Sequence, residues 1–271
     1  MIDGTAPLRF DGRVAIVTGA GHGLGREYAL LLASRGAQVV VNDLGGGVDG
    51  TGGDAAPAEA VAGECRELGA DALVARADVA VDADCRGLAA EVERRFGRAD
   101  VLVNNAGTTK FVPAKDLDGL DADDFHRIYA VNVVGVFQMV RAFAPLLGRQ
   151  PGAAIVNVSS IASLMGIGSS LAYMASKGAL NALTMGLARA LGPALRVNAI
   201  APGLVETPWL QSGHGVDKYA RMVQSYRAIA ALDAVIAPDE VAEAAWFLGV
   251  KATKTTGEVL LLDAGLRLTR G

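Results

Sequence analysis

Seven short apolar runs alternate with longer stretches of helical periodicity along this chain, and the alternation restricts the folds that it can adopt. The apolar runs are Val14–Thr18, Val39–Asn42, Ala72–Ala77, Val101–Asn104, Ala154–Ser159, Leu195–Ala199 and Val259–Leu262. Helical spacing occurs at about 24–35, 55–68, 82–96, 122–147, 170–191 and 239–248. Several runs are apolar at almost every position, which is typical of strands covered on both faces. The sequence therefore predicts an α/β fold with a doubly wound, seven-stranded parallel sheet and helices on both faces.

The 271 residues suit one large domain, and neither a linker nor an internal repeat divides them. Gly45–Asp54 contains six glycines and is predicted to be a loop. Val205–Pro238 interrupts the alternation before the last helix and strand. Beside the carboxyl edge of a sheet, such a segment suits a lid. We expect a single domain over residues 1–271 with a substrate lid at about 205–238.

The composition argues against several kinds of partner. The net charge is −4 and no basic block occurs, so a nucleic-acid partner has no electrostatic basis. No run approaches the length needed to span a bilayer, and Met1–Phe10 lacks the apolar stretch of a secretory signal. Cys65 and Cys85 are far apart and the three histidines are scattered, so we expect neither a disulfide framework nor a metal site. These features predict a cytoplasmic protein that binds no membrane.

A glycine-rich turn, T-G-A-G-H-G-L-G at Thr18–Gly25, follows the first predicted strand and opens the first predicted helix. The free amides and the positive dipole end of a helix N-terminus attract anions, and glycines let the backbone approach a pyrophosphate. The spacing is T-G-x-x-x-G-x-G rather than G-x-G-x-x-G. A tight connection without a ligand could have the same sequence, but the strand before it and the helix after it favour a dinucleotide. The expected contacts are Gly19, Gly21, His22, Gly23 and Leu24.

Asp43 ends the second predicted strand, 18 residues after Gly25. A carboxylate at this position can accept hydrogen bonds from the adenosine ribose hydroxyls and repels a 2′-phosphate. It therefore favours NAD, with NADP the less favoured cofactor. The alternative interpretation is that Asp43 only caps the turn before Gly45.

Tyr173 and Lys177 are four residues apart, which places them on one face of a predicted helix. Ser160 precedes Tyr173 by thirteen residues and ends a predicted buried strand. Alone, the Tyr–Lys pair could be part of an ordinary amphipathic face. In combination with Ser160, the glycine-rich turn and Asp43, it indicates a catalytic group.

Together these motifs resemble those of the short-chain dehydrogenase/reductase family, in its single-domain branch. The resemblance extends from Gly12 to Leu268 and includes, besides the glycine-rich turn, the motifs Asn104-Asn105-Ala106-Gly107, Asn132, Ser160, Tyr173-x-x-x-Lys177 and Pro202-Gly203. It implies a Rossmann-type fold and hydride transfer between a nicotinamide and a substrate carbon.

The resemblance also implies a role for each catalytic residue. Tyr173 would exchange a proton with the substrate oxygen, and Lys177 would lower the tyrosine pKa from about 10 and hold the nicotinamide ribose. Ser160 would stabilise charge on the substrate oxygen. Asn132 would bend its helix and hold a relay water. Ser159 could replace Ser160, although alternation along the strand turns the two apart, and Asn132 could simply bond a neighbouring backbone group.

Further cofactor contacts follow from the resemblance. Asp78 and Val79 would meet the adenine, and Asn105, Ala106 and Gly107 would line the cofactor pocket. Pro202, Gly203 and Thr207 would meet the nicotinamide amide, and Tyr173 and Lys177 would also contact the cofactor. For Thr207 the alternative is capping of the first turn of the lid.

The substrate pocket is expected to be apolar, because its predicted lining includes Leu164, Met165, Ile167, Leu204, Trp209 and Leu210 and no arginine cluster. We expect an NAD-dependent oxidoreductase of a neutral secondary alcohol or ketone. The alternatives are an NADPH-dependent 3-oxoacyl thioester reductase, against which Asp43 argues, and a non-enzymatic dinucleotide sensor, which we would expect to lack the tyrosine or the lysine. The family resemblance also implies a homo-oligomer, usually a tetramer.

Overall fold

A single sheet of seven parallel strands organises the computed structural model, which describes residues 9–268. The strand order is β3-β2-β1-β4-β5-β6-β7. The strands are β1 (Val14–Thr18), β2 (Gln38–Asn42), β3 (Ala72–Ala75), β4 (Val101–Asn104), β5 (Ala154–Val158), β6 (Arg196–Pro202) and β7 (Val259–Leu262). The predicted α/β class, strand number and doubly wound parallel order are confirmed. The N-terminal segment in which we expect no secretory signal lies, up to Leu8, outside the described residues.

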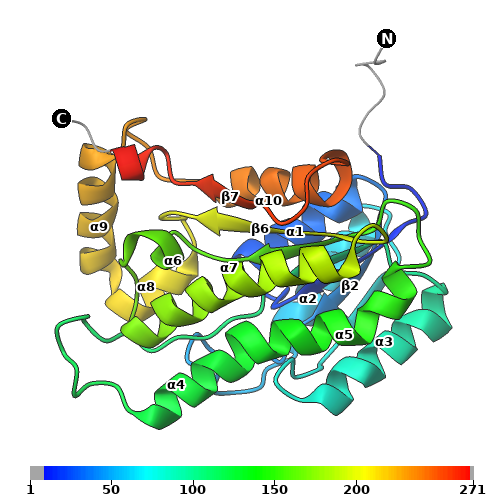
Figure 1. Ribbon diagram of the computed structural model, residues 1–271, viewed down its shortest axis with the longest axis horizontal. Coiled ribbons are helices and arrows are strands. Elements are labelled where there is room, and N and C mark those ends of the chain that lie inside the picture. Colours follow the sequence, from blue (N-terminus) through cyan, green and yellow to red (C-terminus); the bar gives the residue numbers. More distant parts are fainter. Residues whose placement is uncertain (1–8, 269–271) are drawn as a thin grey trace.

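Two layers of helices cover the sheet (Figure 1). The helices are α1 (Gly23–Ser34), α2 (Ala56–Glu67), α3 (Asp82–Phe96), α4 (Ala122–Tyr129), α5 (Val136–Leu147), α6 (Ala162–Met165), α7 (Leu171–Leu191), α8 (Pro208–His214), α9 (Val216–Ile229) and α10 (Pro238–Trp246). Helices α1, α2 and α10 contribute to one hydrophobic core, and α3, α5 and α7 contribute to the other. Every residue of β1, β4 and β5 is buried, because these strands lie between the two layers.

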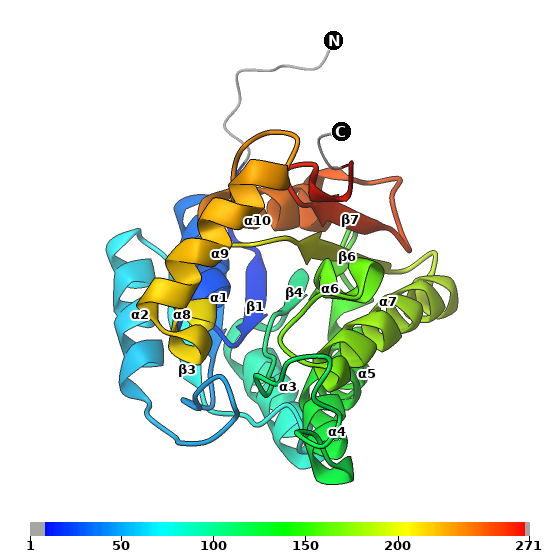
Figure 2. The ribbon, with the colours of Figure 1, turned by 90° about the vertical axis from the view of Figure 1, so that its left-hand side faces the viewer.

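The strand order reverses at β1: β2 and β3 are added on one side of it, and β4 to β7 on the other. Thr18 is in register with Asn42, and Asn104 with Asn157, so polar residues end neighbouring strands. In α/β sheets, ligands bind beyond the carboxyl ends of the strands near such a reversal. Figure 2 looks onto this end of the sheet, with α8 and α9 in front of the strands.

The predicted helix over 122–147 contains a π-helical segment, η1 (Ala130–Gly135), between α4 and α5. Asn132 lies within this segment and is fully buried. A second π-helical segment, η2 (Phe247–Lys251), extends α10, and a 3₁₀ turn, η3 (Leu266–Leu268), follows β7. The segment Val205–Pro238, which interrupts the sequence pattern, is mostly helical and contains α8 and α9.

The expectation that no run could span a bilayer is wrong by length and composition for one helix. Ala122–Leu147 has 26 residues, and its most apolar window has a mean hydropathy of 1.6. Half of that window is buried in the protein. Its buried side chains, among them Met139 and Phe143, belong to the core on one face of the sheet. We therefore interpret it as a core helix.

Candidate active site

A cavity of about 1380 Å³ lies where the strands end, and most of the sequence-predicted residues line it. Those residues are Gly19, His22, Gly23, Leu24, Asp43, Asp78, Val79, Asn105, Ala106, Gly107, Ser160, Tyr173, Lys177, Pro202, Gly203 and Thr207. The other two predicted residues, Gly21 and Asn132, do not line the cavity and lie behind its wall. One cavity thus joins the predicted dinucleotide contacts to the predicted catalytic side chains.

The glycine-rich turn is tied to the segment that follows β4. The Thr18 hydroxyl accepts hydrogen bonds from the amides of Asn105 and Ala106, both at 3.0 Å. The Asn105 side chain donates in return to the carbonyl oxygens of Thr18 and Gly19. A Cβ at Gly25 would overlap the carbonyl oxygen of Gly19, so only glycine allows this close turn.

Helix α1 begins at the cavity without a side chain that caps it. His22 occupies the N-cap position and makes no capping hydrogen bond, and the first turn contains no acidic residue. The amides of this turn are therefore available to an anion, as a bound pyrophosphate requires. Thr207 packs against Gly23 from the other wall. Its side chain does not cap α8, which argues against the alternative that it serves only as a cap.

Asp43 uses both carboxylate oxygens to hold the backbone around it. Oδ2 accepts from the Gly21 amide and Oδ1 from the Gly45 amide, each at 2.7 Å. The capping role is therefore present in the structure. The carboxylate also lines the cavity, and each oxygen keeps acceptor capacity for a ribose hydroxyl. The two interpretations of Asp43 are compatible.

Tyr173 and Lys177 lie in the first two turns of α7. Ser170 caps this helix, since its hydroxyl accepts from the Tyr173 amide at 3.2 Å. The Lys177 Nζ donates to the Val158 carbonyl oxygen at 2.8 Å and lies 5.5 Å from the centroid of the Tyr173 ring. The buried lysine stem and the end of β5 therefore fix the position of the ammonium group.

Burial dominates the protonation of both side chains. It raises the pKa of Tyr173 to about 12, although a side-chain hydrogen bond with Ser160 lowers it. Burial also lowers the pKa of Lys177 to about 8. The expected lowering of the tyrosine pKa by Lys177 is not among the causes here, because desolvation penalises both charged forms. At pH 7 the pair is therefore a neutral phenol beside a mostly protonated amine.

The two serines at the end of β5 differ in their surroundings. The Ser159 hydroxyl donates to Asn181 Oδ1 at 2.6 Å and is buried against α7. Both serines border the cavity, but Ser160 is only partly buried, its hydroxyl accepts from the Ala162 amide, and it lowers the pKa of Tyr173. This geometry favours Ser160 over Ser159 as the serine that meets a substrate.

Asn132 links the π-helical segment to two other parts of the site. Its Nδ2 donates to the Thr108 carbonyl oxygen and to the Ser176 hydroxyl, and its Oδ1 accepts from the Thr108 amide at 2.8 Å. A Cβ at Gly107 would lie 3.4 Å from Asn132 Oδ1 and 3.8 Å from Lys177 Nζ. Asn132 thus bonds neighbouring backbone groups, as in the alternative interpretation, and lies close behind Lys177.

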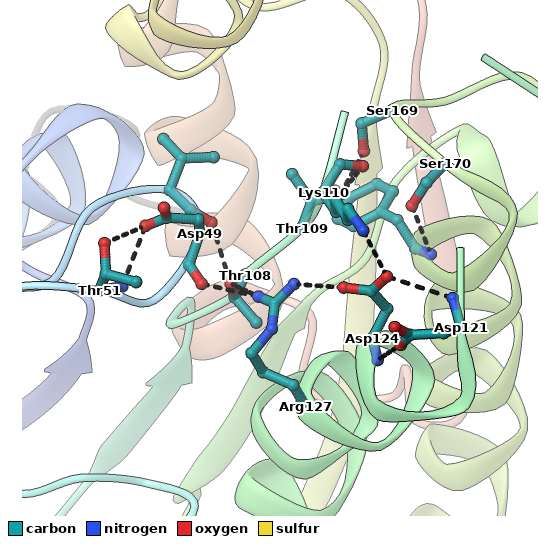
Figure 3. Close-up of polar contacts among 12 residues, drawn as sticks. Asp49, Thr51, Thr108, Thr109, Lys110, Asp121, Asp124, Arg127, Ser169 and Ser170 are labelled. Carbon is teal, nitrogen blue, oxygen red and sulfur yellow. Dashed lines mark hydrogen bonds and ion pairs between the residues drawn. The ribbon is translucent and has the colours of Figure 1, made fainter. Parts of the chain in front are cut away.

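The glycine-rich loop after β2 is fastened across the cavity to the segment after β4 (Figure 3). The Val48 carbonyl oxygen accepts from the Thr108 hydroxyl and from the Thr109 amide. Arg127 donates to the Asp49 carbonyl oxygen at 2.6 Å and to Asp124 Oδ1 at 3.2 Å. The sequence predicts only a loop at 45–54, whereas residues 46–50 form part of the cavity wall.

Two cations in the cavity wall, Lys218 and Arg221 on α9, are absent from the sequence-predicted site. The sequence predicts a pocket without an arginine cluster, because its apolar pattern does not predict α9. Their spacing of three residues would place them on one helix face. That spacing was the available signal.

Comparison with known proteins supports the fold and shows the family. The profile of the family described as enoyl-(acyl carrier protein) reductase matches residues 19–267. A Streptomyces violaceoruber protein assigned as ketoacyl reductase 2 of the granaticin polyketide synthase is 42% identical over 255 residues, which are 94% of this chain and 96% of that protein.

Two solved structures are similar over almost their whole length. A 7α-hydroxysteroid dehydrogenase with NADH and 7-oxo glycochenodeoxycholic acid has a TM-score of 0.83 and 31% identity, covering 96% of both chains. A gluconate 5-dehydrogenase of Burkholderia cenocepacia with NADP and tartrate has a TM-score of 0.83 and 31% identity, covering 97% of this chain and 98% of its own.

Proposed function

Because the chain belongs to the short-chain dehydrogenase/reductase family, whose enzymes act on CH–OH groups with a nicotinamide dinucleotide, we propose that it transfers hydride between NAD and a secondary alcohol or ketone. The observation that carries this proposal is that Ser160, Tyr173 and Lys177 share one cavity with the uncapped start of α1.

The residues of the cavity fit a dinucleotide. The amides at the start of α1 would bind the pyrophosphate, with Gly19 and Gly25 permitting the close approach. Asp78 and Val79 would border the adenine, and the wall around Pro202 would border the nicotinamide. When bound, the nicotinamide supplies or accepts the hydride. The other proposed cofactor contacts are Gly21, His22, Gly23, Leu24, Asn105, Ala106, Gly107, Tyr173, Lys177, Gly203 and Thr207.

Tyr173 would transfer the proton. As a neutral phenol it can donate to the oxygen of a ketone while hydride reaches the carbon, and in the reverse direction it receives the proton of the alcohol. Lys177 would stabilise the phenolate by its charge. The Ser160 hydroxyl would donate to the substrate oxygen and orient it. Asn132, close behind Lys177, would support proton exchange with solvent.

Asp43 supports NAD over NADP. A 2′-phosphate near its carboxylate would meet a like charge that two backbone amides already hold in place. The relatives include proteins with NADH and with NADP bound, so the preference rests on Asp43.

A second candidate function is the reduction of a 3-oxoacyl thioester with NADPH. The 42% identity to the granaticin ketoacyl reductase favours it. Asp43 counts against the phosphorylated cofactor.

Purified protein offered NAD, NADH, NADP and NADPH with a panel of secondary alcohols, ketones and 3-oxoacyl thioesters tests both candidates. Turnover of simple alcohols with NAD supports the first. Turnover restricted to thioesters with NADPH supports the second and would overturn the first.

We also propose that residues 1–271 act as one domain with 205–238 as its lid, and that the protein is a cytoplasmic homotetramer. Exposed apolar side chains on α5 and α7 suit packing between subunits, since Phe137 is 42% and Met185 55% exposed. Light scattering after size-exclusion chromatography tests the assembly, and a monomer at micromolar concentration would contradict it.

A further inference from the structure

Helix α9 presents one continuous face to the cavity, and its character changes along the helix. Lining residues recur at helical spacing: Lys218, Arg221, Met222, Ser225, Tyr226 and Ile229. The two cations lie near the amino end of the helix, and Tyr226 lies towards the carboxyl end. The wall is therefore cationic at one end and mainly apolar at the other.

Lys218 and Arg221 differ from the other cations of the cavity, because they have no partner among the described residues. Lys110 is paired with Asp124 at 2.6 Å, and Arg127 bonds Asp124 and the Asp49 carbonyl oxygen. Among residues 9–268, neither Lys218 nor Arg221 takes part in a hydrogen bond or an ion pair. Both side chains are exposed to solvent and line the cavity.

The acids of the cavity do not neutralise these cations. The Asp43 carboxylate is held by the Gly21 and Gly45 amides, and Asp78 Oδ1 accepts from the Ala80 amide. Asp49 Oδ1 accepts from Thr51. These carboxylates bond backbone and hydroxyl groups rather than Lys218 or Arg221, and Asp217 is the one acidic residue in the first turn of α9.

The distance along α9 from Lys218 to Tyr226 indicates the length of a ligand that would reach both ends of this wall. The Tyr226 hydroxyl lies against Gly203, in the wall that we assign to the nicotinamide. Lys218 precedes Tyr226 by eight residues, about 12 Å along a helix. Between the two, Met222 faces the cavity together with Ile167 and Trp209 of other segments. An extended apolar body fits this interval.

We propose that Lys218 and Arg221 bind an anionic group of the substrate, which is an oxo or hydroxy compound with an apolar body of medium length and a terminal carboxylate or phosphate. The inference rests on the proposed hydride transfer at Tyr173 and replaces the neutral substrate expected from the sequence. Lys218 and Arg221 are specificity-determining residues in it, and they take no part in the chemical step.

The experiment uses three ketones built on the same ten-carbon chain. They are 9-oxodecanoic acid, its methyl ester, and 2-decanone, which lacks the carboxyl group. Calorimetry with NAD-loaded protein measures their binding, and NADH oxidation measures their turnover. We expect the acid to bind about tenfold more tightly than the ester, the size that two partly exposed ion pairs supply. Its KM should rise with salt, unlike that of the ester.

The double variant Lys218→Met, Arg221→Met should bind acid and ester equally. Arg227→Met is the matched control, because Arg227 lies on the same helix outside the cavity wall and pairs with Glu206. It should keep the tenfold preference. Decyl phosphate, tested as a competitor beside decanoate, decides which anion the pair prefers.

Equal binding of acid and ester to the unaltered protein, or an unchanged preference in the double variant, would overturn the inference. These outcomes differ from failure of the proposed function. If the acid binds preferentially but no ketone is reduced with either dinucleotide, the anion site stands and the proposed hydride transfer falls. If all three ketones are reduced with equal KM, the hydride transfer stands and the anion site falls.

Discussion

The Lys177 ammonium group lies 5.5 Å from the centroid of the Tyr173 ring, and the carbonyl oxygen of Val158 holds it there. Lys177 is buried and Tyr173 is partly buried, and desolvation sets the order in which the two side chains lose their protons. Lys177, with a pKa lowered to about 8, loses its proton before Tyr173, whose pKa is raised to about 12. In free side chains the two pKa values nearly coincide.

We predict that Lys177 titrates near pH 8 in the protein without dinucleotide. Its folded pKa lies below its unfolded value, so the unfolded chain binds more protons between the two. The contribution of this residue to folding stability therefore increases as pH rises from about 8 towards about 10.4. NMR of isotope-labelled lysine, assigned with Lys177→Met, measures the titration. A midpoint near that of the exposed lysines would contradict the prediction.

Tyr173→Phe should lower turnover by about a hundredfold to ten-thousandfold, the usual contribution of a positioned acid or base. Dinucleotide affinity should stay within a small factor, since the phenol oxygen is the only atom removed. Steady-state kinetics and a fluorescence titration with NADH separate the two effects. Turnover equal to that of the parent protein would remove Tyr173 from the proton transfer.

Asp43→Asn should weaken NAD more than NADP. The substitution removes the negative charge but keeps an oxygen that can accept from the Gly21 or Gly45 amide. Loss of a charge-assisted hydrogen bond costs about 1.5–3 kcal/mol, so we expect KM for NAD to rise about tenfold to a hundredfold. The ratio of kcat/KM for the two dinucleotides is the measurement. An unaltered ratio would assign Asp43 to capping alone.

Arg127→Met should loosen the loop over residues 45–54. The arginine joins the Asp49 carbonyl oxygen to Asp124, and the same loop is fastened through the Thr109 amide. Hydrogen exchange of peptides covering the loop and residues 108–110 should become faster. Arg141→Met, which removes the pairing with Asp82 on another face, should leave both peptides unchanged.

Two buried tyrosines should respond in opposite directions to loss of the hydroxyl. Within the described part of the chain the Tyr28 hydroxyl has no hydrogen-bond partner, so Tyr28→Phe should stabilise the protein by about 1 kcal/mol. The Tyr226 hydroxyl donates to the Asp263 carbonyl oxygen, so Tyr226→Phe should destabilise it by about 1 kcal/mol. Urea denaturation compares them, and destabilisation by Tyr28→Phe would show that its hydroxyl is satisfied.

The sequence was sufficient to predict the strands and most of the residues that line the cavity, because the signals are local. Strands such as β1 and β5 are apolar at almost every position, and the glycine-rich turn and the Tyr–Lys pair each lie within one short segment. Helices α8 and α9 were missed although Thr207-Pro208 is an ordinary start signal, since glycines and charges interrupt the apolar pattern between them.

Other features depend on contacts between distant segments. The sequence Ala130–Gly135 reads as ordinary helix, and its π form accompanies the bonds of Asn132 to Thr108. The cations of the cavity mouth depend on where the fold places α9. Burial likewise governs the Tyr173 pKa through the whole surrounding structure, so local charge reasoning missed it.

Gly203 has a consequence for the position of α9 over the cavity. Its missing Cβ leaves room for the Tyr226 hydroxyl, whose bond to Asp263 pins the carboxyl end of α9 to the end of β7. Lys218 lies about 12 Å from this pin along the helix axis. A side chain at position 203 would collide with the Tyr226 hydroxyl and displace the carboxyl end of α9, so Gly203 helps to determine where the helix places Lys218 and Arg221.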